Sequence, residues 1–194
     1  LMDATLAQKT SSGALILLAN DAQNFIEILG KNMAHLYAPW RYSYVSEEKI
    51  EGCVFCHISK NLDDEKMQVL FYDEYCYVVM NKFPYSPGHM MVIPHFHTSN
   101  IEDLEDDVWM QMSIRVRQGV KLLKEIMPCE GVNIGMNLGK AAGAGIEQHV
   151  HYHMLPRWLG DTNFITSIGG ARVYPASFDE ILNKLKSNAS KYFI

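Results

Sequence analysis

Short apolar runs recur through the middle of the chain. Runs rich in Val, Ile, Tyr and Phe, bounded by Asp, Asn, Gly or Pro, are typical of β-strands. The expected strands cover residues 67–73, 76–82, 89–95, 131–139 and 149–155. The first two lie close enough along the chain to form a hairpin, and the segment "PYSPG" that precedes the third is typical of a turn.

Other segments place apolar residues at helical spacing. The longest covers 104–127, with acidic residues at its start and basic residues near its end, an order that the helix dipole favours. Its apolar face consists of Leu104, Val108, Met112, Val116, Val120 and Leu123. Further helices are expected at 24–36 and at about 177–187, and a tight turn at 51–58. This order of elements indicates a mostly antiparallel sheet in the α+β class.

The first 50 residues are expected to form an N-terminal extension to one domain over residues 51–194. The extension would contain the helix at 24–36 and an extended aromatic segment at 37–45, because Pro39 moves the residue before it out of the helical region.

Composition limits the kinds of partner that the protein can be expected to bind and the cellular compartment in which it is expected. The net charge is −5 and no basic stripe is visible, so no nucleic-acid partner is expected. The longest apolar run, "GALILLA" at 13–19, is too short to span a membrane and lacks the flanks of a signal peptide. Cysteines stand at positions Cys53, Cys56, Cys76 and Cys129. In a chain of 194 residues they do not form a disulfide scaffold, so a reducing cytoplasm is expected.

The stretch "HVHYHML" at 149–155 carries the clearest chemistry. In a strand, His149, His151 and His153 share one face, because alternate side chains point the same way. The intervening residues point into the core: Val150, Tyr152 and Met154. Three aligned imidazoles can bind zinc, or one can act as nucleophile or base while its neighbours orient it. The alternative is a polar strand surface that faces solvent.

The loop before this strand, "NLGKAAGAG" at 137–145, lets backbone N–H groups approach a phosphate. Small residues in a loop are more often a simple turn, but the neighbouring histidines favour a phosphate site. Few cationic residues lie nearby, so amides, imidazoles and Asn137 would have to bind the phosphate.

Cys53 and Cys56 form a C-x-x-C motif, which is half of a tetrahedral zinc site. No second C-x-x-C exists in the sequence, so two histidines would have to complete the site. A redox-active C-x-x-C is the alternative.

These motifs together resemble the histidine triad (HIT) family, whose signature is H-φ-H-φ-H-φ-φ with φ apolar. The similarity covers about residues 53–158 and includes "CVFCHI", "MNKFPYSPGHMMVIPHFH" and "NLGKAAG". Further segments are similar to the branch that contains diadenosine tetraphosphate phosphorylases and dinucleoside polyphosphate hydrolases: "LYAPWRYSYV", "AGAG" and "PRWLGDTNF".

The resemblance implies a HIT-like fold with an antiparallel sheet of about five strands per subunit, and a homodimer in which two sheets join. It also implies cleavage at the α-phosphorus of a nucleotide through a covalent nucleotidyl-histidine. His151 matches the attacking residue, and His89 matches a histidine that supports the triad by hydrogen bonding. The acceptor would be phosphate or water.

The resemblance also assigns nucleotide contacts. Asn137, His153 and the backbone from Gly143 to Gly145 would stabilise the transition state. Asn81 matches a ribose-binding position. The residues that match the walls of a pocket for adenine or another purine are Val54, Phe55 and Ile58, which could equally be core residues.

One departure concerns the phosphate loop, where Ala144 and Gly145 replace a Gln followed by Ser or Thr, with one extra residue before His149. A side-chain donor is therefore missing. Backbone N–H groups would replace it, or the space would admit a larger acceptor such as inorganic phosphate.

For the C-x-x-C motif, the resemblance implies a structural zinc site completed by His97 and His149. His95 and His57 lie nearby in the sequence but do not match the family's ligand positions. Two alternatives to the dinucleoside polyphosphate enzyme stay open: a nucleoside phosphoramidate hydrolase, and a zinc-stabilised nucleotide-binding module with little turnover.

Overall fold

The computed structural model describes residues 50–163, 166, 168 and 176–194. The helix expected at 24–36 and the aromatic segment at 37–45 lie outside the described residues, as does the extension up to residue 49. Among the described residues, no helix has the length and apolar character needed to cross a membrane.

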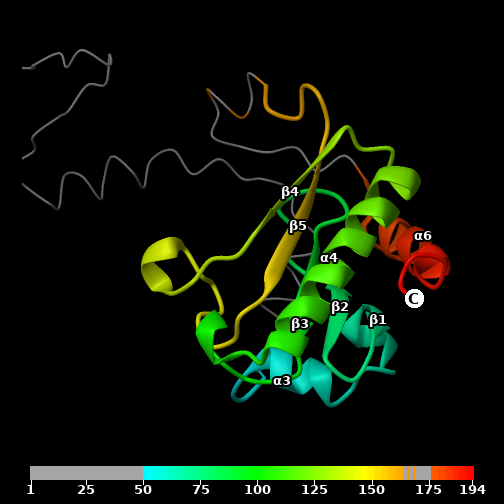
Figure 1. Cartoon of the computed structure of the whole chain (residues 1–194). Helices are drawn as coiled ribbons and strands as arrows, with labels where there is room; N and C mark the ends of the chain where they lie inside the picture. Colours follow the sequence, from blue (N-terminus) through cyan, green and yellow to red (C-terminus); the bar gives the residue numbers. More distant parts are fainter. Residues whose placement is uncertain (1–49, 164–165, 167, 169–175) are drawn as a thin grey trace, which may run out of the picture. The chain divides into compact units, whose positions relative to one another are not determined.

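A five-stranded sheet organises the described part of the chain (Figure 1). Its strands are β1 (Val69–Tyr72), β2 (Cys76–Met80), β3 (Met90–Pro94), β4 (Gly131–Gly135) and β5 (Tyr152–Arg157). They lie in the order β1-β2-β3-β5-β4, and every neighbouring pair is antiparallel. The α+β class and the antiparallel sheet expected from the sequence are confirmed.

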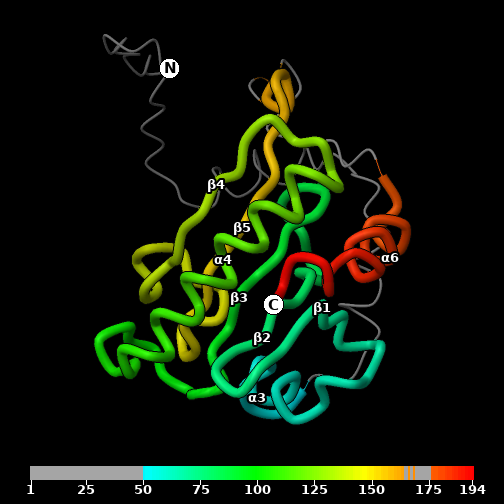
Figure 2. The backbone as a smooth tube through the Cα atoms, turned by 45° about the vertical axis from the view of Figure 1, so that its right-hand side comes forward, coloured from blue at the N-terminus to red at the C-terminus, as the bar shows by residue number. Residues whose placement is uncertain are grey.

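Three helices are fully contained in the described part of the chain: α3 (Val54–Ser59), α4 (Asp106–Ile126) and α6 (Phe178–Ala189). Short 3-10 turns occur at η1 (Glu65–Met67), η2 (Ile101–Asp103) and η3 (Lys140–Ala142). The predicted helices at 104–127 and at about 177–187 are thus present within a few residues, and α4 and α6 pack against the sheet and each other (Figure 2).

The core on the α4 face forms because alternate strand residues point toward the helices. Val78, Val92 and Met154 are fully buried there, together with Met112 and Leu123 of α4. The buried stripe of α4 runs through Gly119 rather than Val120, which is only partly buried. A Cβ at Gly119 would lie 2.8 Å from the Met154 sulfur, so glycine permits this close approach of α4 to β5.

A second, smaller core lies on the opposite face of the sheet. It contains Phe55 from α3 together with Tyr77, Val79, Met91 and Ile93 from β2 and β3. Helix α3 covers this face, and the buried Tyr77 hydroxyl donates to the Phe55 carbonyl at 2.8 Å. The tight turn expected at 51–58 is therefore wrong: this segment is a short helix fixed to the sheet by the buried Phe55 ring.

Two strand boundaries also differ from the expectation. The strand predicted at 149–155 begins at Tyr152 and continues through Pro156 to Arg157. The residues just before Tyr152 form their hydrogen bonds outside the ladder with β3: the Val150 N–H donates to the Thr98 carbonyl at 2.8 Å, and His149 Nε2 donates to the Pro94 carbonyl at 2.9 Å. The strand expected at 131–139 ends at Gly135.

Candidate functional site

The three histidines of the "HVHYHML" stretch face the same side of the sheet as α3. His149, His151 and His153 are only 0%, 6% and 8% exposed. Val150 and Met154 lie in the core on the opposite face, which confirms the predicted alternation. The burial of the three imidazoles contradicts the alternative of a solvent-facing polar strand.

Hydrogen bonding assigns the proton of His151. Its Nδ1 lies 2.8 Å from the carbonyl oxygen of His149, and a carbonyl only accepts, so Nδ1 carries the proton. The neutral ring therefore keeps its lone pair on Nε2. The Phe55 ring packs against this imidazole, with the ring centroids 4.8 Å apart. His151 is thus held in the tautomer that a nucleophile or base requires.

A second chain of hydrogen bonds assigns the proton of His153. The backbone N–H of Tyr85 donates to His89 Nδ1 at 3.2 Å, so neutral His89 carries its proton on Nε2. This Nε2 donates to His153 Nδ1 at 2.9 Å. His153 then keeps its own proton on Nε2 and can donate it in a hydrogen bond. The His151 and His153 ring centroids are 4.7 Å apart, so a lone pair and an N–H donor lie side by side.

Burial keeps these imidazoles neutral. It lowers the pKa of His89 to about 3 and that of His153 to about 4, and nearby histidines add to both effects. Burial also lowers the pKa of His151, although the bond to the His149 carbonyl opposes this. At neutral pH the proton positions above therefore describe the dominant state.

Asn81 lies beside His89 in the structure. Its carbonyl oxygen accepts from the backbone N–H of Phe83 at 2.9 Å, and its NH₂ group lies 3.2 Å from His89 Nδ1. The side chain therefore helps to orient His89. Its expected contact with a ribose stays a prediction.

The predicted phosphate loop contains the turn η3 and two glycines with positive φ, Gly139 at 77° and Gly143 at 88°. Some of its amides are used inside the loop, since Gly143 donates to Lys140 O and Ala144 donates to Gly139 O. Within the described residues, the Gly145 amide has no backbone acceptor. The donors expected from Gly143 to Gly145 are thus reduced mainly to Gly145, with the half-buried Asn137 nearby in sequence.

The four residues expected to bind metal come together at one end of α3. One ligand atom from each of Cys53, Cys56, His97 and His149 lies within 4.8 Å of all the others. Cys53 Sγ and Cys56 Sγ are 3.4 Å and 3.7 Å from His149 Nδ1, and Cys56 Sγ is 3.1 Å from His97 Nδ1. A tetrahedral zinc ion with ordinary bond lengths separates sulfur and nitrogen ligands by about 3.5 Å.

The hydrogen bonds of the neighbouring ring nitrogens also fit a metal site. His149 Nε2 donates to the Pro94 carbonyl at 2.9 Å, which leaves Nδ1 as the free ligand atom facing the thiols. His95 is engaged elsewhere, with Nδ1 2.6 Å from the Ser59 hydroxyl and Nε2 2.9 Å from Asp73 O. His57 is not among the clustered residues. Cys53, Cys56, His97 and His149 could therefore hold a metal ion.

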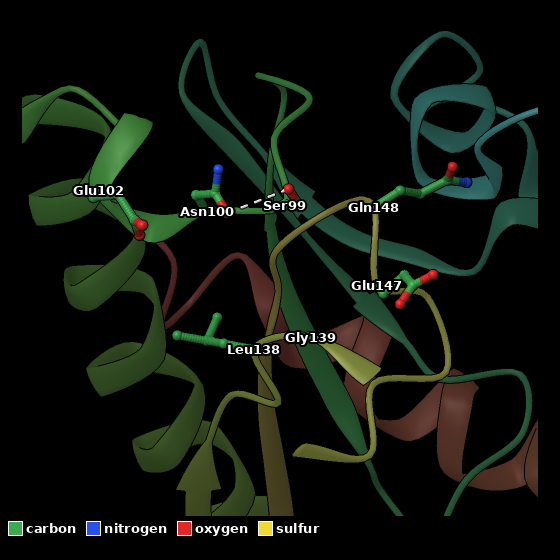
Figure 3. Close-up of a pocket in the computed structure, with 7 residues that line it drawn as sticks. All are labelled: Ser99, Asn100, Glu102, Leu138, Gly139, Glu147 and Gln148. Atoms are coloured by element: carbon green, nitrogen blue, oxygen red, sulfur yellow. Dashed lines mark hydrogen bonds between the residues drawn. The ribbon is translucent and has the colours of Figure 1, made fainter. Parts of the chain in front are cut away.

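Two hollows border the site. The larger, about 550 Å³, lies between the start of η2 and the two ends of the phosphate loop (Figure 3). Figure 3 shows Ser99, Asn100 and Glu102 above Leu138 and Gly139, with Glu147 and Gln148 at the right of the hollow. The second, about 470 Å³, is lined by Tyr85, Asn133, Leu155 and Arg157. The sequence did not predict either hollow.

Sequence reasoning also missed Tyr85 and Ile146. The Tyr85 ring lies 4.7 Å from the His89 ring and 5.8 Å from the His153 ring, measured between centroids. Ile146 packs against the core that contains Phe55. The one available signal for Tyr85 was its position in the turn just before His89, which says nothing of its direction.

Comparisons with known proteins agree with this geometry. The HIT domain matches residues 63–158. The chain is 35% identical over 152 residues to an AP-4-A phosphorylase of Mycobacterium tuberculosis, covering 74% of this chain and 77% of that protein. It is 28% identical over 106 residues to an adenosine 5'-monophosphoramidase of Saccharomyces cerevisiae, covering 55% of this chain and 63% of the other.

Among solved structures, a Zn-bound histidine triad family protein from Mycobacterium smegmatis matches with a TM-score of 0.60 and 27% identity. The match covers 72% of this chain and 94% of that protein. The extent of these similarities, together with the buried triad and the five-stranded sheet, shows that the chain belongs to the histidine triad (HIT) family of nucleotide hydrolases and transferases.

Proposed function

We propose that this enzyme cleaves a dinucleoside polyphosphate, such as diadenosine tetraphosphate, at an α-phosphate through a covalent intermediate on His151. The observation that carries the proposal is the pairing of a lone pair on His151 Nε2 with an N–H donor on His153 Nε2. The similarity to an AP-4-A phosphorylase supports the choice of substrate.

In the first step, His151 Nε2 attacks the α-phosphorus, and the bond from that phosphorus to the bridging oxygen breaks. A nucleotidyl-histidine forms, and the rest of the substrate leaves with the bridging oxygen, as ATP in the case of diadenosine tetraphosphate. The positive charge that develops on the His151 ring is stabilised by the His149 carbonyl, which accepts its Nδ1–H. The N–H of His153, with Asn137 and the Gly145 amide, is available to the phosphate oxygens.

In the second step, an acceptor attacks the phosphorus and the bond to His151 breaks. Inorganic phosphate gives ADP, and water gives AMP. Neither Ala144 nor Gly145 offers a side-chain donor to the phosphate, so this part of the loop leaves space beside the reacting phosphorus. This space favours phosphate as the acceptor.

The base of the transferred nucleotide is proposed to lie against α3, and adenine is the proposed base. Phe55 is 2% exposed and packs against both Tyr77 and His151, so it acts mainly as a core residue. Val54 and Ile58 are only partly buried beside it and would offer the apolar surface to the base.

A second candidate is a nucleoside phosphoramidate hydrolase, which the similarity to an adenosine 5'-monophosphoramidase favours. Its first step would be the same attack by His151, with an amine as the leaving group and water as the acceptor. The two candidates differ in the leaving group and the second acceptor, so the products distinguish them.

The metal held by the four clustered ligands is proposed to be zinc in a structural role. All of the ligands come from the protein, which is typical of a structural rather than a catalytic zinc site. When bound, the ion would fix the start of α3 to the segment after β3 and to His149. The observation in its favour is the spacing of sulfur and nitrogen atoms at 3.1–3.7 Å.

A homodimer through β4 is also proposed. Strand β4 is an edge of the sheet, and Ile134, its fourth residue, is 49% exposed. An edge strand offers unpaired N–H and C=O groups to another strand, and an exposed apolar residue there favours a covered edge. A second copy of the chain, paired antiparallel at β4, would continue the sheet.

The four unpaired cysteine thiols favour a reducing cytoplasm as the compartment.

The first prediction tests the reaction. Purified enzyme should consume diadenosine tetraphosphate and, with inorganic phosphate present, release ADP and ATP, as resolved by ion-exchange chromatography. His151→Ala should lower turnover by at least about 10³-fold, because the nucleophile is removed. The matched control, His57→Ala, changes a histidine outside the site and should retain turnover. Full activity of His151→Ala would disprove the proposal, and nucleotide binding without any consumption would indicate a binding module.

The second prediction concerns pH. Protonation of His151 removes the Nε2 lone pair, and burial lowers the pKa of this ring, so the protonated fraction stays small until the pH falls below the ordinary histidine value. The value of kcat/KM should therefore stay nearly constant from pH 8 down to about 6.5 and decline only at lower pH. Circular dichroism at each pH would separate loss of fold from loss of nucleophile. A half-maximal rate at or above pH ~7 would contradict the assignment.

The third prediction concerns zinc. Enzyme purified without chelators should contain about one zinc ion per chain by mass spectrometry of the metal, as four protein ligands imply. Cys53→Ser should lose most of the zinc and lower Tm by at least about 5 °C, because a metal bound only to the folded state stabilises that state. Cys129→Ala changes a cysteine outside the cluster and should keep the zinc. Equal, low zinc contents in the wild type and both variants would rule the site out.

The fourth prediction concerns assembly. Sedimentation should show a dimer at micromolar concentration, and Ile134→Lys should weaken it at least about tenfold, because a charge would be buried at the joined edge. Tyr72→Lys places the same charge on β1, at the other edge of the sheet, and should leave the dimer intact. A shift to monomer in Tyr72→Lys alone would place the interface at β1 instead.

A further inference from the structure

The histidine pair lies between two aromatic side chains with very different exposure. On one side, Phe55 packs against His151, with the ring centroids 4.8 Å apart, and is 2% exposed. On the other side, Tyr85 packs against His89 and His153 and is 53% exposed. Phe55 is therefore used by the core, whereas much of the Tyr85 ring faces solvent and is open to a ligand.

Tyr85 forms one wall of the 470 Å³ hollow, with Leu155, Asn133 and Arg157 as the others. Leu155 follows His153 by two residues on β5, so its side chain shares the face of the catalytic histidine. Asn133 on β4 pairs directly with Leu155 across the sheet. At about 3.3 Å per residue, Leu155 lies roughly 13 Å along the strand from His151. The hollow is thus on the catalytic face, beyond His153 and away from the metal cluster.

The charges of this hollow favour a neutral ligand. The guanidinium of Arg157 donates from Nε and Nη2 to the carboxylate of Asp161, and from Nη1 to Asn133 Oδ1 at 2.7 Å. Asp161 compensates the positive charge, and the contacts hold the guanidinium in place. The remaining walls are a phenol, an amide and a leucine. Such a lining suits a flat, uncharged aromatic group with hydrogen-bonding edges better than a phosphate.

We infer that the hollow at Tyr85 binds the base of the leaving nucleotide, which stacks on the Tyr85 ring. The inference rests on the proposed function, since only a dinucleoside substrate has a second base. The transferred nucleotide would lie against α3, the reacting phosphorus at His151, and the second base beyond His153. Tyr85 would then be the residue by which the enzyme distinguishes dinucleoside polyphosphates from nucleotides with a single base.

The test compares diadenosine tetraphosphate with adenosine 5'-tetraphosphate, which has the same phosphate chain and lacks the second nucleoside. Calorimetry in the His151→Ala background measures both dissociation constants without turnover. We expect diadenosine tetraphosphate to bind about tenfold more tightly, as the stacking of one base on an aromatic ring allows. Adding Tyr85→Ala should abolish this ratio. Tyr85→Phe retains the ring and should keep it, and Tyr72→Ala is the matched control on the opposite edge strand.

Three outcomes would overturn the subsite. The first is equal binding of the two compounds before Tyr85 is changed, and the second is that Tyr85→Ala leaves the binding of both compounds unchanged. The third is equal weakening of both compounds by Tyr85→Ala, which would mean that the ring acts by positioning His89 and His153. Failure of the proposed function is recognised separately, because wild-type enzyme would then leave diadenosine tetraphosphate intact.

Discussion

His149 connects the two chemical centres of this protein. Its ring offers Nδ1 to the cysteine thiols because Nε2 is bonded to the Pro94 carbonyl. Its own carbonyl accepts the Nδ1 proton of His151 and so leaves the His151 lone pair on Nε2. The position of one residue thus determines both the fourth ligand of the metal cluster and the tautomer of the proposed nucleophile. A metal that fixes the His149 ring would also fix the carbonyl that orients His151.

The sheet supplies the second constraint, because it separates the apolar core from the imidazoles. Val150 and Met154 anchor one side of the stretch beneath α4, so the histidines between them must face α3. Burial lowers the pKa values of His89, His151 and His153, because the charged form of each imidazole loses its contact with water. The same packing that stabilises the sheet therefore keeps the proposed nucleophile neutral at physiological pH.

The strands, the long helix and the metal cluster could be predicted from the sequence because each has a local pattern. Alternation placed the three histidines on one face, and the C-x-x-C motif indicated two ligands. Helix α3 could not be predicted in this way, because six residues are too few to show a helical period. The residues just before β5 bond to the Thr98 and Pro94 carbonyls, more than fifty residues earlier in the chain, and no local pattern indicates these partners. The contact of His89 with the Tyr85 amide uses a backbone N–H. Every residue except proline has this group, so the sequence does not indicate the contact.

The phosphate loop agrees with the family resemblance in residue type but not in the number of free backbone donors. Asn137 and Gly143 match the family's positions, but Gly143 and Ala144 donate their amides within the loop. The loop thus offers the reacting phosphate fewer backbone donors than the resemblance implied, and no hydroxyl. The Nε2–H of His153 therefore becomes the principal side-chain donor to the phosphate, because the position of its proton is set by hydrogen bonding. Because the position of that proton depends on His89, and the tautomer of His89 depends on the Tyr85 amide, the turn before β3 acts on phosphate binding indirectly, through these two histidines, under the proposed mechanism.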